Sequence, residues 1–371
     1  MRVVVAPDSF GGTLTATTAA AAVAQGWRRA APGDELVLLP LADGGPGFVD
    51  VLRTALGGEW HELAVTGPLG TPVVARWLGV GETAYVECAA ACGLHLVPAE
   101  RRDPATARTV TSRGVGELVA DARLRGATEI VVGLGGSATT DGGAGMLAAL
   151  GAVAVDGNGT PVPSGSPARA DRLAGLPALD GVRLVLAADV DNPLLGRHGA
   201  AAVFAPQKGA DPTAVGELDA ALTRFADVLA TAFGHDVRDD AGAGAAGGLG
   251  AALLACGARR VSGAGLVRSL VGLDAELDRA GLAVTGEGSF DWQSLRGKLV
   301  TAVAAAAAER GLPCVVLAGQ VSVGRREAAS VGVEAAYAVA DGAGGLEASL
   351  ADPAGTLSAL AERVASRWSR R

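Results

Sequence analysis

Residues 129–151 read EIVVGLGGSATTDGGAGMLAALG. The stretch begins with an apolar run, continues through glycine, serine, threonine and aspartate, and ends in an alanine-rich segment. This order predicts a buried strand, then a loop, then a helix. Because strand–helix units build parallel sheets, repetition of this pattern along the chain would indicate an α/β protein.

The pattern does recur. Six further apolar runs stop at a loop of glycine or acidic residues, at 2–6, 35–41, 183–188, 282–285, 313–318 and 334–339. Alanine-rich stretches that we expect to be helical lie at 13–31, 47–57, 144–151, 214–234 and 297–311. Apolar strands that alternate with helices are typical of parallel sheets buried on both faces. We therefore expect an α/β protein with ligands bound beyond the carboxyl ends of its strands.

One region departs from this alternation. Residues 61–97 contain short alternating runs separated by Gly-Pro-Leu-Gly and Gly-Val-Gly-Glu, which predict antiparallel hairpins. A chain of 371 residues is long enough for two domains. We expect residues 1–60 and 280–371 to form a doubly wound, mostly parallel α/β domain. Residues 61–279 would then form an inserted, mixed α/β domain that carries the glycine-rich loop.

Composition restricts the class of partner. A net charge of −8 argues against nucleic acid and against an anionic membrane surface, so we expect a small-molecule partner. The chain enters a strand without a charged leader and has no apolar stretch of membrane-spanning length, which predicts a cytoplasmic protein. The four cysteines and four histidines are scattered without metal-ligand spacing, and we expect reduced thiols. The oligomeric state, monomer or homo-oligomer, is left open.

The glycine-rich loop suggests a phosphate site. Gly133–Ala138 resembles a dinucleotide fingerprint, with Asp156 at a suitable distance, but the loop continues with hydroxyls, a carboxylate and further glycines. No Walker-type P-loop motif occurs in the sequence. Backbone N–H groups exposed by glycine at a helix start suit phosphates, so we expect a polyphosphate cradle; close helix–sheet packing is the alternative. Its expected nucleotide-binding residues are Gly135, Gly136, Ser137, Thr139, Asp141, Gly142 and Gly143.

Carboxylates follow two other strands. Asp189 and Asp191 come after an apolar run, where strand alternation would aim both side chains the same way, and such oxygen ligands suit Mg²⁺ bridging phosphates. A local turn cap is the alternative. Residues 286–291 offer Glu287 and Asp291 ahead of Lys298.

Lysine is rare in this chain. Lys298 and Lys208 are the two lysines among 31 basic residues, and each is a candidate phosphate contact or a surface charge. A second glycine-rich stretch, 242–248, is expected either to shape a helix start or to touch a ligand.

Several blocks together resemble the bacterial two-domain, ATP-dependent glycerate kinases. They are VVVAPDSF (3–10), LADGG (41–45), GLGGSATTDGGAGMLAALG (133–151), DVDNPLLG (189–196), AAAVFAPQKGA (200–210), GAAGGLGAALLA (244–255) and TGEGSFDWQSLRGK (285–298). The resemblance implies transfer of the ATP γ-phosphate to a hydroxyl of D-glycerate, with Mg²⁺, in a cleft between two α/β domains.

The resemblance also suggests roles. We assign Asp189, Asp191, Lys298 and Asp43 to catalysis, with Asp189 and Asp191 as the metal ligands. The acceptor would be bound by Asp8, Ser9, Gly44, Gly45, Glu287 and Asp291.

The chain departs from the family motifs at three charged positions. Gly11 stands where the family usually has lysine, Pro46 where it has glutamate, and Ser289 where it has arginine. We therefore hypothesise an altered acceptor pocket that takes a substrate larger or less anionic than glycerate. A non-catalytic nucleotide-binding descendant and a dinucleotide-dependent oxidoreductase are the rival interpretations.

Overall fold

The computed structural model describes residues 1–163, 165, 167–296, 299–342 and 345–369. The chain forms two compact units, which we describe separately. Unit 1 comprises Met1–Ala42, Asp50–Leu56 and Ala264–Arg371, and unit 2 comprises Asp43–Val49 and Gly57–Gly263. Both ends of the chain lie in unit 1. Residues 43–49 and 57–60 lie in unit 2 and residues 264–279 in unit 1, so the units divide the chain at other positions than the 1–60, 61–279 and 280–371 that we expected.

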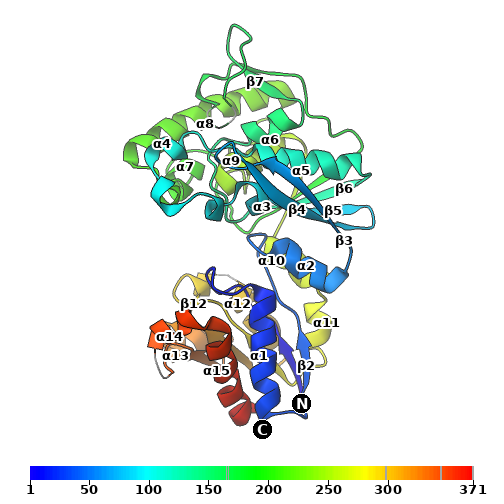
Figure 1. The fold of residues 1–371 in the computed structure, drawn as a ribbon, viewed down its shortest axis with the longest axis vertical. Coiled ribbons are helices and arrows are strands. Elements are labelled where there is room, and N and C mark those ends of the chain that lie inside the picture. Colours follow the sequence, from blue (N-terminus) through cyan, green and yellow to red (C-terminus); the bar gives the residue numbers. More distant parts are fainter. Residues whose placement is uncertain (164, 166, 297–298, 343–344, 370–371) are drawn as a thin grey trace. The chain divides into compact units, whose positions relative to one another are not determined.

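Unit 1 contains a parallel sheet with the strand order β15-β13-β11-β1-β2. Its strands are β1 (Arg2–Val5), β2 (Glu35–Leu38), β11 (Leu282–Thr285), β13 (Cys314–Ala318) and β15 (Ala335–Ala338). Helices α1 (Ala16–Ala30) and α15 (Pro353–Trp368) lie side by side against the sheet (Figure 1). Alternate strand residues such as Val3 and Val5 pack against these helices, and α12 (Leu299–Ala308) packs against β11 and β13.

Local sequence explains the helix pair. The Thr15 hydroxyl caps α1 by accepting from the backbone N–H of Thr18, and Asp352 caps α15 by accepting from that of Gly355. The two helices approach so closely at Gly26 that an added Cβ would lie 1.8 Å from the carbonyl oxygen of Ser358.

Unit 1 also contains several shorter elements. They are α2 (Phe48–Leu56, from Asp50 onward), α10 (Gly263–Leu270, from Ala264 onward), α11 (Leu273–Leu277), α13 (Arg325–Ser330), α14 (Gly345–Ala351), and the strands β12 (Ser289–Phe290) and β14 (Gln320–Val321).

Unit 2 contains a mixed sheet with the order β10-β9-β6-β5-β4-β3. Its strands are β3 (Glu59–Thr66), β4 (Pro72–Val80), β5 (Thr83–Glu87), β6 (Glu129–Gly133), β9 (Arg183–Ala187) and β10 (Arg259–Val261). Strand β4 pairs antiparallel with β3 and β5, as the hairpin pattern predicts, while β5, β6, β9 and β10 run parallel. The remainder of the expected hairpin region is helical, because an alanine-rich turn, Cys88–Cys92, follows β5 directly.

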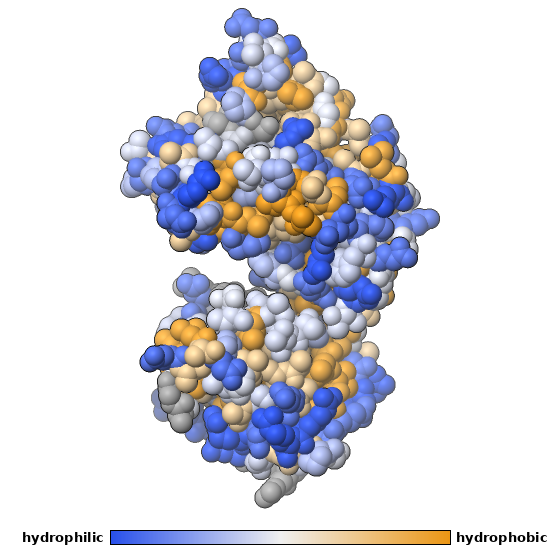
Figure 2. Space-filling model, viewed as in Figure 1, coloured by the Kyte–Doolittle hydropathy of each residue, from blue (hydrophilic) through white to orange (hydrophobic). Residues whose placement is uncertain are grey.

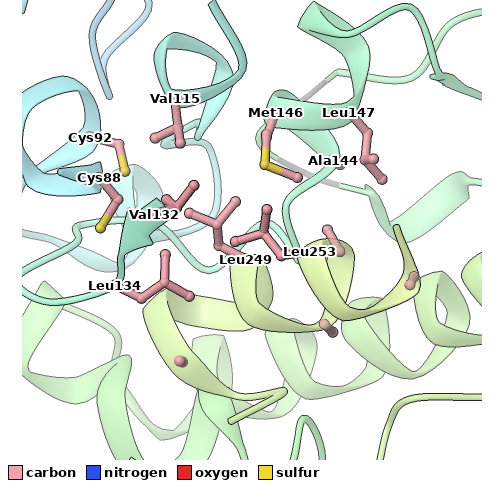
Figure 3. Close-up of a cluster of buried hydrophobic side chains, with 14 of the residues drawn as sticks. Cys88, Cys92, Val115, Val132, Leu134, Ala144, Met146, Leu147, Leu249 and Leu253 are labelled. Carbon is pink, nitrogen blue, oxygen red and sulfur yellow. The ribbon is translucent and has the colours of Figure 1, made fainter. Parts of the chain in front are cut away.

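The helices of unit 2 share one core cluster with one face of its sheet, which contributes residues such as Val86, Val132 and Leu186. These helices are α3 (Cys88–Cys92), α4 (Pro104–Ala107), α5 (Arg113–Leu124), α6 (Ala144–Ala149), α7 (Ala200–Phe204), α8 (Pro212–Phe233) and α9 (Ala245–Ala255), with a small β7–β8 pair (Val153–Val155, Arg172–Ala174). Figure 3 shows Cys88 and Cys92 of α3 in one cluster with Val132 of β6 and Leu249 of α9. Among the described residues, no helix is long and apolar enough to cross a membrane.

The α/β class is confirmed, and each expected strand is present to within a few residues. The expected 297–311 helix is α12, and its predicted first two residues lie outside the described residues.

Candidate active site

The carboxyl edge of the unit 2 sheet brings several loops together. Leu134, which follows β6, donates its backbone N–H to the carbonyl of Ala187 at 3.0 Å, and Ala188 donates to Val261 of β10 at 3.1 Å. The next residue in the loop, Gly135, donates to the carbonyl of Gly44 at 3.1 Å. The segment 43–45 therefore lies against the ends of β6 and β9.

Glycine permits this close approach. An added Cβ at Gly135 would lie 2.3 Å from Cα of Gly45, and one at Gly44 would lie 2.8 Å from the carbonyl oxygen of Ala187. Gly44 also has a φ of +94°, a conformation that favours glycine. These glycines fix the position of the neighbouring Asp43 through backbone packing.

Asp43 and Asp189 flank the same pair of residues. The hydroxyl of Ser262 donates to Oδ1 of Asp189 at 2.6 Å, and a Cβ at Gly263 would lie 2.1 Å from the backbone oxygen of Asp43. The Asp43 carboxylate accepts from the N–H of Gly45 at 3.0 Å. Both aspartates are exposed, and each carboxylate accepts a hydrogen bond at this edge.

Asp191 has a different environment from Asp189. Strand β9 ends at Ala187, so both aspartates lie in a loop and the strand alternation that we expected to align them does not extend to them. Asp191 pairs with the guanidinium of Arg260 and is 78% exposed. The described residues contain no group of three or more histidine, cysteine or acidic side chains placed to hold a metal ion.

The second half of the expected phosphate cradle faces inward. The fully buried carboxylate of Asp141 accepts from the N–H and hydroxyl of Ser112, both at 2.8 Å, and from the N–H groups of Gly143 at 3.1 Å and Gly145 at 3.2 Å. Burial raises the pKa of Asp141 above its usual value, although these hydrogen bonds act in the opposite direction. The Asp141 carboxylate thus holds the loop in shape.

The second glycine-rich stretch packs on the first. Gly142 donates its N–H to the carbonyl of Gly247 at 3.0 Å, and an added Cβ at Gly247 would lie 1.8 Å from the carbonyl oxygen of Thr139. Ala246 has a φ of +50°, which bends the start of α9. The residues 246–248 therefore shape the 139–142 loop, and Ala246 also lines the cavity described next.

The first half of the cradle lines a cavity of about 270 Å³ within unit 2. The loop contributes Gly135, Gly136 and Ser137, and α7 and the residues after it contribute Phe204 and Lys208. The other lining residues are Leu94, Leu134, Val190, Gln207 and Ala246. In Figure 2 hydrophobic surface gathers on the visible face of unit 2, in the area of α3 and α7. The cavity thus combines apolar walls with a glycine-rich loop.

Lys208 is buried at this cavity, with 4% of its surface exposed. Its Nζ donates to the carbonyl oxygen of Thr139 at 2.6 Å and to Oγ of Ser137 at 3.3 Å. Burial lowers the pKa of Lys208 to about 8. The sequence offered this lysine and Lys298 equally as phosphate contacts, and Lys298 lies outside the described residues.

Unit 1 has its own pocket, of about 350 Å³, at the ends of β1, β11 and β13. Asp8 donates its N–H to the carbonyl of Gly286 at 2.8 Å, and Gly319 donates to that of Glu287 at 3.1 Å, so the three loops are joined. The lining includes polar groups (Ser9, Thr13, Glu287, Ser289, Asp291, Gln320) and apolar ones (Phe10, Val339, Leu346, Leu350, Leu357). The structure thus gathers Ser9, Glu287 and Asp291, with Asp8 beside them.

Two of the three departures from the family motifs lie in this pocket. Gly11 and Ser289 both line it, and an added Cβ at Gly11 would meet nothing within 4 Å. Pro46 lies in unit 2 instead, where an added Cβ at Gly136 would be 2.8 Å from its Cγ. The altered positions therefore concern both candidate sites.

Sequence reasoning missed several residues that organise these loops. Ser262 follows a short strand whose residues, Arg-Arg-Val, carry no apolar pattern. The buried Glu87 accepts from the N–H of Gly47 at 2.9 Å, and Ser112 donates to Asp141. Each residue thus holds a loop that is distant from it in sequence. No local signal in the chain marks such partners.

Comparison with known proteins identifies the family. The glycerate kinase family model matches residues 3–369. Glycerate 2-kinase of Escherichia coli K12 is 42% identical over 94% of this chain and 92% of its own length, and protein Mb2228c of Mycobacterium bovis is 48% identical over 99% and 91%. A solved structure of a glycerate kinase 2 from Salmonella typhimurium LT2 superposes with a TM-score of 0.83 at 40% identity, covering 100% of this chain and 98% of that one.

These matches overturn the oxidoreductase interpretation, because they extend over the whole chain rather than over a single glycine-rich loop. The chain belongs to the glycerate kinase family and is a phosphotransferase that acts on an alcohol group.

Proposed function

We propose that this protein transfers the γ-phosphate of ATP to a hydroxyl of D-glycerate or of a closely related hydroxy acid or glyceryl compound, with Mg²⁺ as cofactor. Relatives over nearly the whole chain are glycerate kinases. The unit 2 cavity carries the proposal, since it joins apolar walls to a glycine-rich loop and a buried lysine.

The nucleotide would bind in that cavity. Leu94, Val190 and Phe204 offer apolar surface for a base, and the backbone of Gly135–Ser137 lies at the same wall for phosphates. Because phosphoryl transfer requires mainly positioning and charge neutralisation, a rigid loop of this kind suits the reaction. Thr139, Asp141, Gly142 and Gly143 would act indirectly, by keeping the loop in shape.

The carboxyl edge beside the cavity fits a magnesium ion. Mg²⁺ is commonly held by one or two carboxylates together with substrate phosphates and water, and Asp189 and Asp43 are exposed, oriented carboxylates there. When bound, the ion would neutralise charge on the phosphates. Ser262 would orient the Asp189 carboxylate, and Asp43 or Asp189 would accept the proton of the acceptor hydroxyl.

The acceptor would bind in the unit 1 pocket. Ser9, Ser289 and Gln320 can form hydrogen bonds with hydroxyl groups, and Asp291 can accept from them. Gly11 and Ser289 in this same pocket favour a second candidate, an acceptor less anionic or larger than glycerate. Cytoplasmic location and oligomeric state stay predictions.

Coupled ADP release with Mg-ATP tests the proposal. D-glycerate, glycerol and glyceryl derivatives would be compared in wild type and in Asp189→Asn. Turnover of D-glycerate supports the first candidate, and turnover of another acceptor alone supports the second. Binding of Mg-ADP without turnover of any acceptor would contradict both and leave a non-catalytic nucleotide-binding protein.

A further inference from the structure

Lys208 is a buried cation whose hydrogen-bond partners are neutral. Its two acceptors are a backbone carbonyl and a serine hydroxyl, and within the described part of the chain no carboxylate forms an ion pair with it. Burial of an ammonium group without an anionic partner is costly. An ammonium group has three donors, and its position in the cavity wall leaves it beside the space that a ligand would fill.

We propose that Lys208 is the anion-binding group of the unit 2 cavity and contacts the phosphates of the bound nucleotide. The inference rests on the proposed function, which puts the nucleotide in this cavity. Lys208 would then serve two purposes: it fixes the loop through Ser137 and Thr139, and it neutralises negative charge on the ligand.

Within the described part of the chain, none of the acidic groups around Lys208 accepts a hydrogen bond from its ammonium group. Asp141 stabilises the charged lysine from a distance, but its carboxylate oxygens accept from Ser112, Gly143 and Gly145. Cys88 and Cys92 also lie near. The hydrogen bond to Cys92 and burial raise the pKa of Cys88 well above its usual value, so this thiol is uncharged at neutral pH.

A ligand that binds the charged form must raise the pKa of Lys208. In the free protein the lysine loses its proton near pH 8, so Mg-ADP that binds above this pH should bring a proton with it. At pH 8.5 we expect uptake of roughly 0.8 of a proton per Mg-ADP. The dissociation constant should rise about tenfold per pH unit between pH 8.5 and 10.

Calorimetric titration in buffers of different ionisation enthalpy measures this uptake directly, without requiring turnover. The probes are Mg-ADP, inorganic tripolyphosphate as a phosphate without a base, and adenosine as a base without phosphate. Both phosphate ligands should take up a proton, and adenosine should bind with none. Mg-ADP binding without proton uptake overturns the role of Lys208 but not the proposed function.

Variants separate charge from structure. Lys208→Met should weaken Mg-ADP about 10- to 100-fold, leave adenosine affinity within about twofold, and abolish the uptake. Lys208→Arg keeps its charge at all these pH values, so it should bind Mg-ADP without uptake. Gln207→Met, which alters a neighbouring lining residue, should retain the uptake.

Two further outcomes bear on the proposal. If the Lys208 variants fold poorly, the pH dependence of Mg-ADP binding by the wild-type protein still tests the role of Lys208. Proton-linked tripolyphosphate binding without Mg-ADP binding would support an anion site and contradict the nucleotide.

Discussion

The hydroxyl of Ser262 lies 2.6 Å from Oδ1 of Asp189, so a residue after β10 orients a carboxylate that follows β9. The neighbouring Asp191 instead pairs with Arg260 at an exposed position. Asp189 and Asp191 look equivalent in the sequence but have different environments, so we expect their substitutions to have different effects on activity.

Asp189→Asn should lower kcat by about 10²–10³, because it removes the carboxylate that we propose holds Mg²⁺ or accepts the proton of the acceptor hydroxyl. Asp191→Asn, the matched control, should retain kcat within about threefold, since exposed ion pairs contribute little. Steady-state ADP release with the preferred acceptor measures both. Equal losses in the two variants would contradict the separate roles.

Ser262→Ala should lower kcat more than it changes the KM for ATP, by about 3- to 10-fold, because the Asp189 carboxylate loses its orienting hydrogen bond. Ser262→Thr retains the hydroxyl and should restore most of the activity. An alanine variant as active as wild type, or a threonine variant no better than alanine, would exclude this positioning role.

Gly135→Ala should destabilise the protein by about 1–3 kcal/mol and reduce activity, because its Cβ would lie 2.3 Å from Cα of Gly45. Gly216 is an exposed glycine within α8, where an added Cβ meets nothing within 4 Å. Gly216→Ala should therefore stabilise by about 0.5–1 kcal/mol. Urea unfolding of both variants tests the comparison, and similar effects would mean that the loop contact relaxes freely.

Lys208 should make stability depend on alkaline pH in the ligand-free protein. Its folded-state pKa of about 8 lies below the usual 10.5, so the unfolded chain binds more protons between these values. The contribution of this group to the free energy of unfolding should therefore rise from pH 8 to 10.5, by up to about 3 kcal/mol. The difference between wild type and Lys208→Met at each pH isolates it, and a difference independent of pH would refute the shift.

Ser289→Arg should reveal whether the unit 1 pocket prefers a neutral acceptor. An added guanidinium can hold a carboxylate, so the KM for D-glycerate should fall about tenfold while that for glycerol stays within about twofold. Ser366→Arg adds the same charge on the exposed face of α15 and serves as the control. Unchanged KM values in Ser289→Arg would argue against glycerate-like anions in this pocket.

The sequence predicted the fold class well because most of the parallel strands are nearly unbroken apolar runs, which favour burial in a parallel sheet. Strand β10 was missed because its residues, Arg259–Val261, are mostly charged. The site was harder to predict. Asp141 looked like a ligand-facing carboxylate, and only the folded chain shows that Ser112, distant in sequence, encloses it. The different environments of Asp189 and Asp191 likewise depend on where β9 ends.

The segment Asp43–Val49 belongs to unit 2 although unit 1 residues flank it on both sides. A protein made only of residues 57–263 would therefore lack the strip of chain that covers Gly133, Gly135 and Ala187. The glycines at this edge would then expose backbone that is normally enclosed. The candidate catalytic edge of the larger unit is thus completed by a piece encoded early in the gene, so the two units cannot be separated by a single cut or inherited as independent modules.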